Sequence, residues 1–354
     1  MNRLANTPGP MPERGLRPML AKAMATIPTD EPGRWLFEPK WDGFRCLLFK
    51  TGNEVVLSSR SDKDLTRYFP ELVDAARLDL PHRCVIDGEI VVALNDQLDW
   101  DALSARVHPA ASRVAKLAAD TPASFVAFDL LGLDEHSLLD EPLRTRKPLL
   151  RELLPKWTTG SFTVSVDSED PAQAQDWFER FEGAGLDGVV AKDLDSQYMP
   201  DKRSMLKFKH RRSADVVLLG YRLHKSSTED APAVGSLLLG LYDHAGDLQM
   251  VGGASAFTAD QRKQLIAELA DLVTGRDSAE PNRWNSSKDT SFVTLRPERV
   301  CEVAYDQLQN TRFRHTVSFM RWRPDRDAAS CTFDQLETPT RYSLDAVMTG
   351  RNRA

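Results

Sequence analysis

The sequence predicts an α+β fold in two parts, a domain of mostly antiparallel sheets and helices over residues 1–212 and a small OB-fold β-barrel over residues 213–354. The chain has 354 residues, about twice the usual size of one domain. Its first half alternates strand-like and helix-like segments, whereas the chain after Arg212 is mainly β with one helix. The apolar content of 41% is enough to build a core in each part.

In the first part, runs of β-branched and aromatic residues predict strands, and apolar residues at helical spacing predict helices. Gly52 marks a turn between the first two strands, and Gly88 inside a later strand indicates a close backbone approach or a bulge. The expected strands are 35–49, 54–59, 84–94, 124–130, 162–166, 186–192 and 204–209, and the expected helices are 64–78, 100–117, 143–154 and 172–181.

The second part contains short strand-like segments with Gly-containing turns and a single helical segment, 259–273. That helix opens with Thr258 and Gln261 at the spacing of a capping box, and it ends before Gly275. Five strands and one helix are typical of an OB-fold barrel. The expected strands are 216–223, 236–242, 248–254, 300–305 and 316–322.

The composition excludes several classes of protein. No apolar run approaches the roughly 20 residues that a bilayer requires, and the first 17 residues are Pro-rich and polar rather than signal-like. The four cysteines are far apart, without a CxxC pair or a histidine at zinc-finger spacing. We therefore expect a soluble, cytoplasmic protein with reduced thiols.

The net charge of −6 argues against an indiscriminate nucleic-acid binder, because neutralising phosphates requires clustered lysine and arginine. Two such clusters exist, at 202–212 and at 312–326. Each is either a solvated charged face or a surface that binds phosphates.

The strongest local motif is Glu38-Pro39-Lys40-Trp41-Asp42-Gly43-Phe44-Arg45, a lysine in an apolar strand followed by a Gly-containing turn. A free lysine titrates near ~10.4, so its pKa must fall before its amine can attack a phosphate at neutral pH. Burial lowers that pKa, and so do neighbouring cations such as Arg45, Lys207 and Lys209. Lys207 and Lys209 alternate along an expected strand, so both amines should lie on one face.

A series of motifs, taken in order along the chain, resembles the covalent nucleotidyltransferase superfamily, which includes ATP-dependent DNA ligases, RNA ligases and capping enzymes. The resemblance is greatest to the compact bacterial ATP-dependent ligases of the LigC and LigD-ligase type, from about Pro18 onward. Those proteins have a nucleotidyltransferase (adenylation) domain followed by an OB domain. After the Lys40 motif, the matching segments are Ser59-Arg60, Asp87-Gly88-Glu89, Phe128, Asp187-Gly188 with Lys192, Lys207-Phe208-Lys209, and Arg323-Pro324-Asp325-Arg326.

The resemblance implies a role for each residue around the nucleotide. Lys40 matches the nucleophile that forms a phosphoramidate with AMP, and Glu38 matches the residue that reads the adenine amino group. Phe128 matches the aromatic side chain that stacks on the purine. Arg60 matches the arginine that contacts the ribose and also helps to hold the 5′-phosphate of the nick. Glu89 matches a carboxylate that holds the ribose hydroxyls or a metal.

The same resemblance places Arg45 and Lys192 among the ATP-binding residues, and it makes Lys207 and Lys209 catalytic cations beside the α-phosphate. Arg323 and Arg326 match the motif that orients the pyrophosphate when the OB domain closes, with arginine replacing lysine at the last position. Closure and reopening imply a hinge at 210–215. The expected metal ligands, for Mg²⁺ or Mn²⁺, are Asp42, Glu89 and Asp187, and Asp187 departs from the family's glutamate.

These matches imply an ATP-dependent DNA ligase that carries AMP on Lys40 and seals nicks in duplex DNA, in DNA repair. The expected setting is the cytoplasm of a bacterium, associated with the nucleoid. We expect a monomer without membrane contact that binds nicked duplex DNA, and repair polymerases are candidate partners.

Two alternatives stay open at the level of the sequence. An RNA ligase or a GTP-using capping enzyme would have the same nucleophile, and substrate choice would identify it. A non-catalytic OB-type nucleic-acid-binding protein could keep a decayed nucleotide pocket, which the shorter Asp187 would suit. A NAD-dependent ligase fits less well, because little chain precedes Trp35 and zinc-binding cysteines are missing.

Overall fold

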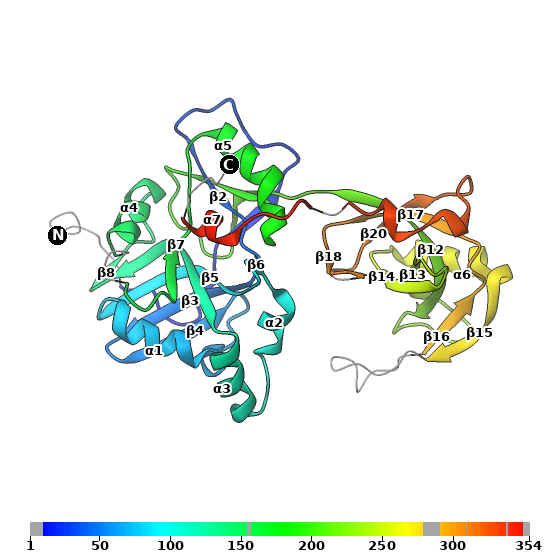
Figure 1. Cartoon of the computed structure of the whole chain (residues 1–354), viewed down its shortest axis with the longest axis horizontal. Coiled ribbons are helices and arrows are strands. Elements are labelled where there is room, and N and C mark those ends of the chain that lie inside the picture. The colour runs from blue at the N-terminus through cyan, green and yellow to red at the C-terminus, as the bar shows by residue number, and fades with distance from the viewer. Residues whose placement is uncertain (1–9, 154–156, 279–290, 310, 338, 350–354) are drawn as a thin grey trace. The chain divides into compact units, whose positions relative to one another are not determined.

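The computed structural model describes residues 10–153, 157–278, 291–309, 311–337 and 339–349, and the chain divides into two compact units. The first unit comprises the described residues up to Lys209 and those from Pro339 onward, and the second comprises the residues between them. Figure 1 labels most of the elements of both units. In the described part of the chain, no helix is long and apolar enough to cross a membrane.

The first unit contains two sheets. The smaller sheet has the order β1–β11–β10–β2, in which β1 runs parallel to β11 and the other neighbours are antiparallel. Its strands are β1 (Leu20–Ala23), β11 (Arg203–Phe208), β10 (Val189–Asp193) and β2 (Trp35–Pro39).

The larger sheet has the order β4–β3–β5–β7–β8, with β6 beside β5 and β9 beside β7. The strands are β3 (Phe44–Thr51), β4 (Glu54–Ser59), β5 (Arg83–Leu94), β6 (Gln97–Leu98), β7 (Ala123–Leu133), β8 (His136–Ser137) and β9 (Phe162–Val164). The helices of this unit are α1 (Pro70–Asp79), α2 (Trp100–Ala105), α3 (Ala111–Asp120), α4 (Leu143–Leu153), α5 (Pro171–Arg180) and α7 (Leu344–Thr349).

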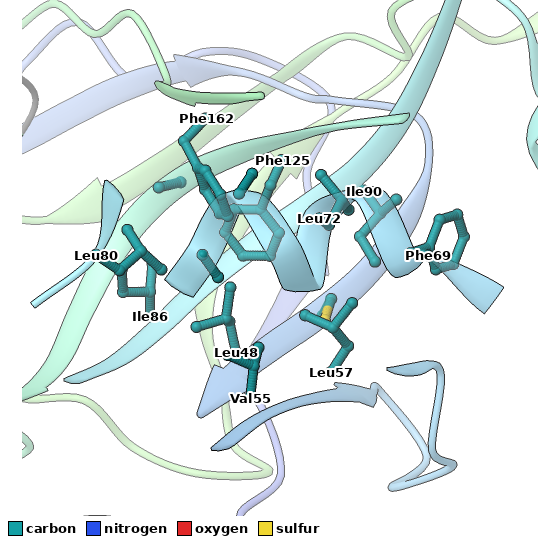
Figure 2. Close-up of a cluster of buried hydrophobic side chains, with 14 of the residues drawn as sticks. Leu48, Val55, Leu57, Phe69, Leu72, Leu80, Ile86, Ile90, Phe125 and Phe162 are labelled. Atoms are coloured by element: carbon teal, nitrogen blue, oxygen red, sulfur yellow. The ribbon is translucent and has the colours of Figure 1, made fainter. Parts of the chain in front are cut away.

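An apolar core lies between α1 and the larger sheet. Leu72 of α1, Leu48 of β3 and Phe125 of β7 are fully buried there, and Figure 2 shows their side chains gathered in one cluster. The ring of Phe162 on β9 lies 5.6 Å from that of Phe125. Burial of side chains of this size supplies most of the free energy that holds a helix on a sheet.

Two expected elements are each broken in the structure. The strand expected at 35–49 is divided between the two sheets, because β2 ends at Pro39 and β3 begins at Phe44. A Cβ atom at Gly43 would lie 2.2 Å from the carbonyl oxygen of Ile90, so only glycine fits this crossover. The helix expected at 100–117 is two helices, and Pro109 lies in the gap between them, where a helix cannot continue.

Residues 339–349 pack on the first unit, whereas the sequence placed all of 213–354 in the second domain. Leu344 and Val347 of α7 are buried in the same apolar cluster as Trp41. The backbone N–H of Tyr342 donates to the carbonyl of Gly183, and that of Leu344 donates to Asp96. The boundary expected after residue 212 also differs slightly from the division after Lys209.

The second unit has the strand order of an OB barrel. Strands β12, β13 and β14 pair in sequence, β17 pairs with both β12 and β20, and Ala254 at the end of β14 bridges to Val317 just before β20. The five strands thus close in the order first, second, third, fifth, fourth, which confirms the expected fold class. They are β12 (Arg212–Leu223), β13 (Val234–Tyr242), β14 (Leu248–Ala254), β17 (Val300–Tyr305) and β20 (Ser318–Trp322).

Helix α6 (Ala259–Leu269) lies between the third and fourth barrel strands in the chain, and it has the capping box expected from Thr258 and Gln261. Two hairpin-like pairs were not expected from the sequence. They are β15 (Val273–Ser278) with β16 (Ser291–Leu295), and β18 (Leu308–Gln309) with β19 (Arg312–Phe313).

Candidate active site

Lys40 lies in the short loop that leaves β2, not inside a strand as the sequence suggested. Its backbone N–H donates to the carbonyl of Gly188 (2.8 Å), and the N–H of Asp187 donates to the carbonyl of Lys40 (3.0 Å). Gly188 has φ +114°, and a Cβ atom there would lie 2.0 Å from the carbonyl oxygen of Phe208. This glycine therefore lets the backbone hold Asp187 directly beside Lys40.

The side chains of Lys40, Lys207, Lys209, Asp187 and Glu89 form what we call the Lys40 cluster. The Nζ atom of Lys40 lies 2.5 Å from Oδ2 of Asp187, and Nζ of Lys209 lies 2.7 Å from the same oxygen. The Lys40 side chain is 21% exposed, so its amine is shielded but accessible to a ligand. One carboxylate oxygen thus holds two ammonium groups together.

Lys209 follows the last residue of β11, and Lys207 lies within that strand. Burial lowers the pKa of Lys207, and the charges of Lys209, Lys40 and Arg60 lower it further. The structure thus brings these four cations of the sequence motifs into one electrostatic neighbourhood. A site with this surplus of positive charge suits a polyphosphate.

The two carboxylates of the Lys40 cluster have opposite pKa shifts. Burial by itself would raise the pKa of Asp187, but the ammonium groups of Lys40 and Lys209 lower it overall. Burial raises the pKa of Glu89 to about 7, although Arg45 and Lys40 oppose that change. Asp187 is therefore ionised at neutral pH, whereas Glu89 titrates close to it.

Arg45 is fixed by Asp87, which is held in turn by Tyr198, a residue that sequence reasoning did not single out. Its guanidinium donates to both oxygens of Asp87, at 2.6 and 2.7 Å, and lies 4.5 Å from the centroid of the Phe128 ring. The hydroxyl of Tyr198 donates to Asp87 (2.6 Å) and accepts from the backbone N–H of Met19 (3.0 Å). Because the ion pair is bidentate and Tyr198 holds Asp87 in place, the guanidinium plane of Arg45 is held in one orientation.

A second group, the Glu38 cluster, consists of Glu38, Lys147, Lys192, Asp167 and Phe128. Nζ of Lys147 lies 2.9 Å from Oε1 of Glu38, and Nζ of Lys192 lies 2.9 Å from Oε2. The three side chains are only 2 to 5% exposed. Lys192 also lies 4.4 Å from the centroid of the Phe128 ring, and burial lowers its pKa.

Sequence reasoning missed Lys147, although a signal was available. Helix α4 buries Leu143, Arg146, Lys147, Leu150 and Leu153, which recur at the spacing of one helix face. Two of these five positions carry charge on the face that should be apolar. Charged residues at such positions indicate buried partners, which here are Glu38 for Lys147 and Asp129 for Arg146.

Arg323 and Arg326 lie in the second unit, around Asp215. The guanidinium of Arg323 contacts both oxygens of Asp215 at 2.9 Å and also pairs with Asp325. Nε of Arg326 lies 3.7 Å from Oδ2 of Asp215. The motif, which follows β20, thus forms a local ion-pair network with Asp215 of β12.

The expected metal ligands do not form a complete cage. Among the described residues, no group of three or more His, Cys, Asp or Glu side chains could hold a metal ion. A metal that arrives bound to a polyphosphate needs only one or two protein carboxylates, because the phosphates supply other oxygens. Lys40 and Lys209 both contact Oδ2 of Asp187, so Oδ1 is the oxygen that Asp187 could offer to a metal ion.

Comparisons with known proteins show which family the chain resembles. The family model described as "ATP dependent DNA ligase domain" matches residues 18–209, and the one described as "ATP dependent DNA ligase C terminal region" matches residues 230–326. The chain is 54% identical over 346 residues to "DNA ligase C1" of Mycolicibacterium smegmatis, covering 94% of this chain and 97% of that protein. It is 49% identical over 357 residues to "DNA ligase C" of Mycobacterium tuberculosis, with the same coverage.

A solved chain from a structure–function study of Lig E DNA ligases is similar in fold, with a TM-score of 0.56 at 16% identity. The match covers 86% of this chain and 99% of that chain. The first family model alone spans more than half of the sequence and contains the Lys40 and Glu38 clusters. The chain therefore belongs to the ATP-dependent DNA ligases and is a DNA ligase enzyme.

Proposed function

We propose that Lys40 takes the adenylyl group from ATP, that AMP then passes to the 5′-phosphate of a nick in duplex DNA, and that the adjacent 3′-hydroxyl displaces AMP to seal the strand. The observation that carries this proposal is the Lys40 amine, which shares one oxygen of Asp187 with Lys209 and lies in the electrostatic neighbourhood of Lys207. A single amine with a carboxylate partner and a positive surrounding is suited to attack a phosphorus atom.

In the first step, a bond forms between Nζ of Lys40 and the α-phosphorus of ATP, and the bond from that phosphorus to the bridging oxygen breaks. Pyrophosphate leaves with the electron pair of that bond. The amine loses a proton, and Oδ2 of Asp187 is an acceptor 2.5 Å away. Lys207 and Lys209 stabilise the negative charge that grows on the phosphate oxygens in the transition state.

Other residues hold the nucleotide. Glu38 accepts a hydrogen bond from the amino group of adenine, Phe128 stacks on the purine, and Arg45, Arg60 and Lys192 complete the binding surface. Mg²⁺ or Mn²⁺ on the triphosphate would be held by Asp42, Glu89 and Asp187, and it would neutralise phosphate charge. Arg323 and Arg326 of the second unit would orient the pyrophosphate.

The proposed substrate is nicked duplex DNA, gripped through phosphate contacts by the basic segments 202–212 and 312–326. We place this activity in DNA repair, in a monomer associated with the nucleoid, and repair polymerases are the proposed partners. Affinity for the nick should fall steeply with salt, because each neutralised phosphate releases counterions.

The test is incubation of the protein with labelled ATP and nicked DNA, with both protein-bound AMP and sealed product measured. Lys40→Ala should form neither. The matched control is Lys116→Ala, which removes an exposed lysine of α3 that pairs with its helix neighbour Asp120. Labelling of Lys40→Ala at the wild-type level would refute the proposal, and GTP and nicked RNA in parallel would identify a capping enzyme or an RNA ligase.

A further inference from the structure

Lys147 is a buried cation that the proposed chemistry does not use. It lies on α4, and its side chain is 2% exposed. A charged side chain is rarely buried to this degree unless specific partners compensate for the loss of water. Its nearest partner is the Glu38 carboxylate, which Lys192 approaches as well.

The two lysines divide the Glu38 carboxylate between them. Lys147 contacts Oε1 and Lys192 contacts Oε2, each at 2.9 Å, so a rotation of the carboxylate would break both contacts. Lys147 is itself held from further sides, by Oδ2 of Asp167 at 3.5 Å and by the carbonyl of Phe128 at 3.4 Å. The Glu38 carboxylate is therefore held by lysines from two separate elements, α4 and β10, and Lys147 is in turn held by Asp167 and Phe128.

In this cluster Lys147 and Lys192 oppose Glu38 and Asp167, and Asp167 also pairs with Arg151. An ion-paired carboxylate accepts hydrogen bonds and cannot donate one. Each carboxylate oxygen can accept more than one hydrogen bond, so Glu38 can accept a hydrogen bond from the amino group of a ligand in addition to those from its two lysines. It would repel the keto oxygen that guanine presents at the same ring position.

We propose that Lys147 is a specificity-determining positioning residue, which with Lys192 holds Glu38 as the acceptor for the 6-amino group of adenine. This inference rests on the proposed function, since it assumes that the nucleotide base lies against Glu38 and Phe128. Lys147 acts through Glu38, whose carboxylate its amine contacts at 2.9 Å.

The experiment measures the rate at which the protein becomes covalently labelled with nucleotide from ATP and from purine riboside triphosphate, which lacks the 6-amino group. The wild-type protein should prefer ATP. Lys147→Met and Lys147→Gln should reduce that preference by roughly tenfold through the KM for ATP, as expected for a weakened hydrogen bond to a charged acceptor. Lys147→Arg keeps the charge and should retain most of the preference.

A double-mutant cycle separates positioning from stability. In a Glu38→Gln background, Lys147→Met should cause little further loss of preference, because the residue through which it acts is already changed. Thermal unfolding of each variant reports the folded fraction, and Lys147→Gln serves where Lys147→Met does not fold.

Three results can be told apart. A wild-type protein that acquires no nucleotide refutes the proposed function itself. Neutral variants that lose rate equally with both nucleotides, so that the preference is unchanged, show a purely structural lysine and overturn the inference. An additive effect in the Glu38→Gln background overturns it as well.

Discussion

The Glu38 cluster and the Lys40 cluster occupy the same unit of the protein, yet they use charge in opposite ways. In the Glu38 cluster the charges are almost fully buried and paired, and each carboxylate oxygen of Glu38 has its own lysine. In the Lys40 cluster the side chains are partly exposed, and two ammonium groups share one oxygen of Asp187. The first arrangement suits recognition by a fixed acceptor, and the second leaves positive charge for a ligand.

The energetic consequences differ accordingly. Removing one partner from a buried ion pair leaves an uncompensated charge and costs about 3–5 kcal/mol of stability. Partly exposed pairs contribute less, because solvent screens them. Substitutions in the Glu38 cluster should therefore affect both stability and base preference, whereas those in the Lys40 cluster should mainly affect the rate of adenylation.

The largest effect is expected for Asp187→Asn. The amide keeps the shape of the side chain but loses the charge that holds Lys40 and Lys209 and the basicity to accept a proton. Adenylation should slow by roughly 10²–10³-fold, the magnitude typical for the loss of a positioned acid–base or electrostatic group. Single-turnover labelling with ATP measures this rate.

The matched control for that substitution is Asp195→Asn, which removes an exposed carboxylate that pairs with Arg144 at the surface. This variant should adenylate at the wild-type rate. An equal loss of rate in both variants would mean that Asp187 has no special role in the Lys40 cluster.

A smaller effect concerns pH. Because Glu89 titrates at about 7 and must be ionised to hold ribose or metal, adenylation should rise about tenfold between about pH 6 and about pH 8. Glu89→Gln should be slower and should lack this rise. A profile of the variant that keeps the wild-type slope would assign the titration to another group.

The same carboxylate should also affect stability. The folded pKa of Glu89 lies above its ordinary value of 4.5, so its stabilising contribution is complete below about pH 4.5 and is lost as the pH rises through about 7. Glu89→Gln should accordingly raise the free energy of unfolding by roughly 1–3 kcal/mol at about pH 8 and leave it unchanged at low pH. Denaturant titrations at the two pH values measure the difference.

The smallest effect is expected for a substitution that weakens stacking on the adenine base. Phe128→Leu keeps apolar bulk but removes the aromatic face, so the KM for ATP should rise about fivefold, near the lower end of base-stacking energies. The maximal rate should change little, because the Lys40 cluster is intact. A fall in the maximal rate without a change in KM would contradict the separation of the two clusters.

Much of the fold could be predicted from residue patterns. The strands Leu248–Ala254 and Val300–Tyr305 have the expected bounds, because apolar runs end at turn residues on both sides. The Thr258 capping box was also predicted correctly, since its two hydrogen bonds depend only on local spacing. Local signals of this kind do not need the rest of the chain.

The errors arise where a distant segment decides the structure. The break between β2 and β3 depends on a close approach of Gly43 to Ile90, and the packing of α7 on the first unit depends on Gly183 and Asp96. Neither approach is visible in the local pattern. The same holds for the site, where the motifs identified Lys40 and Asp187 but not Tyr198, which reaches Asp87 from far along the chain.

The central claim is that the amine of Lys40 carries the adenylyl group. It is tested most directly by peptide mass spectrometry of the wild-type protein after incubation with ATP and Mg²⁺. We predict an AMP adduct on the peptide that contains Lys40, with fragment ions that place it on that side chain. An adduct on Lys207 or Lys209, or no adduct while nicks are still sealed, would contradict the account.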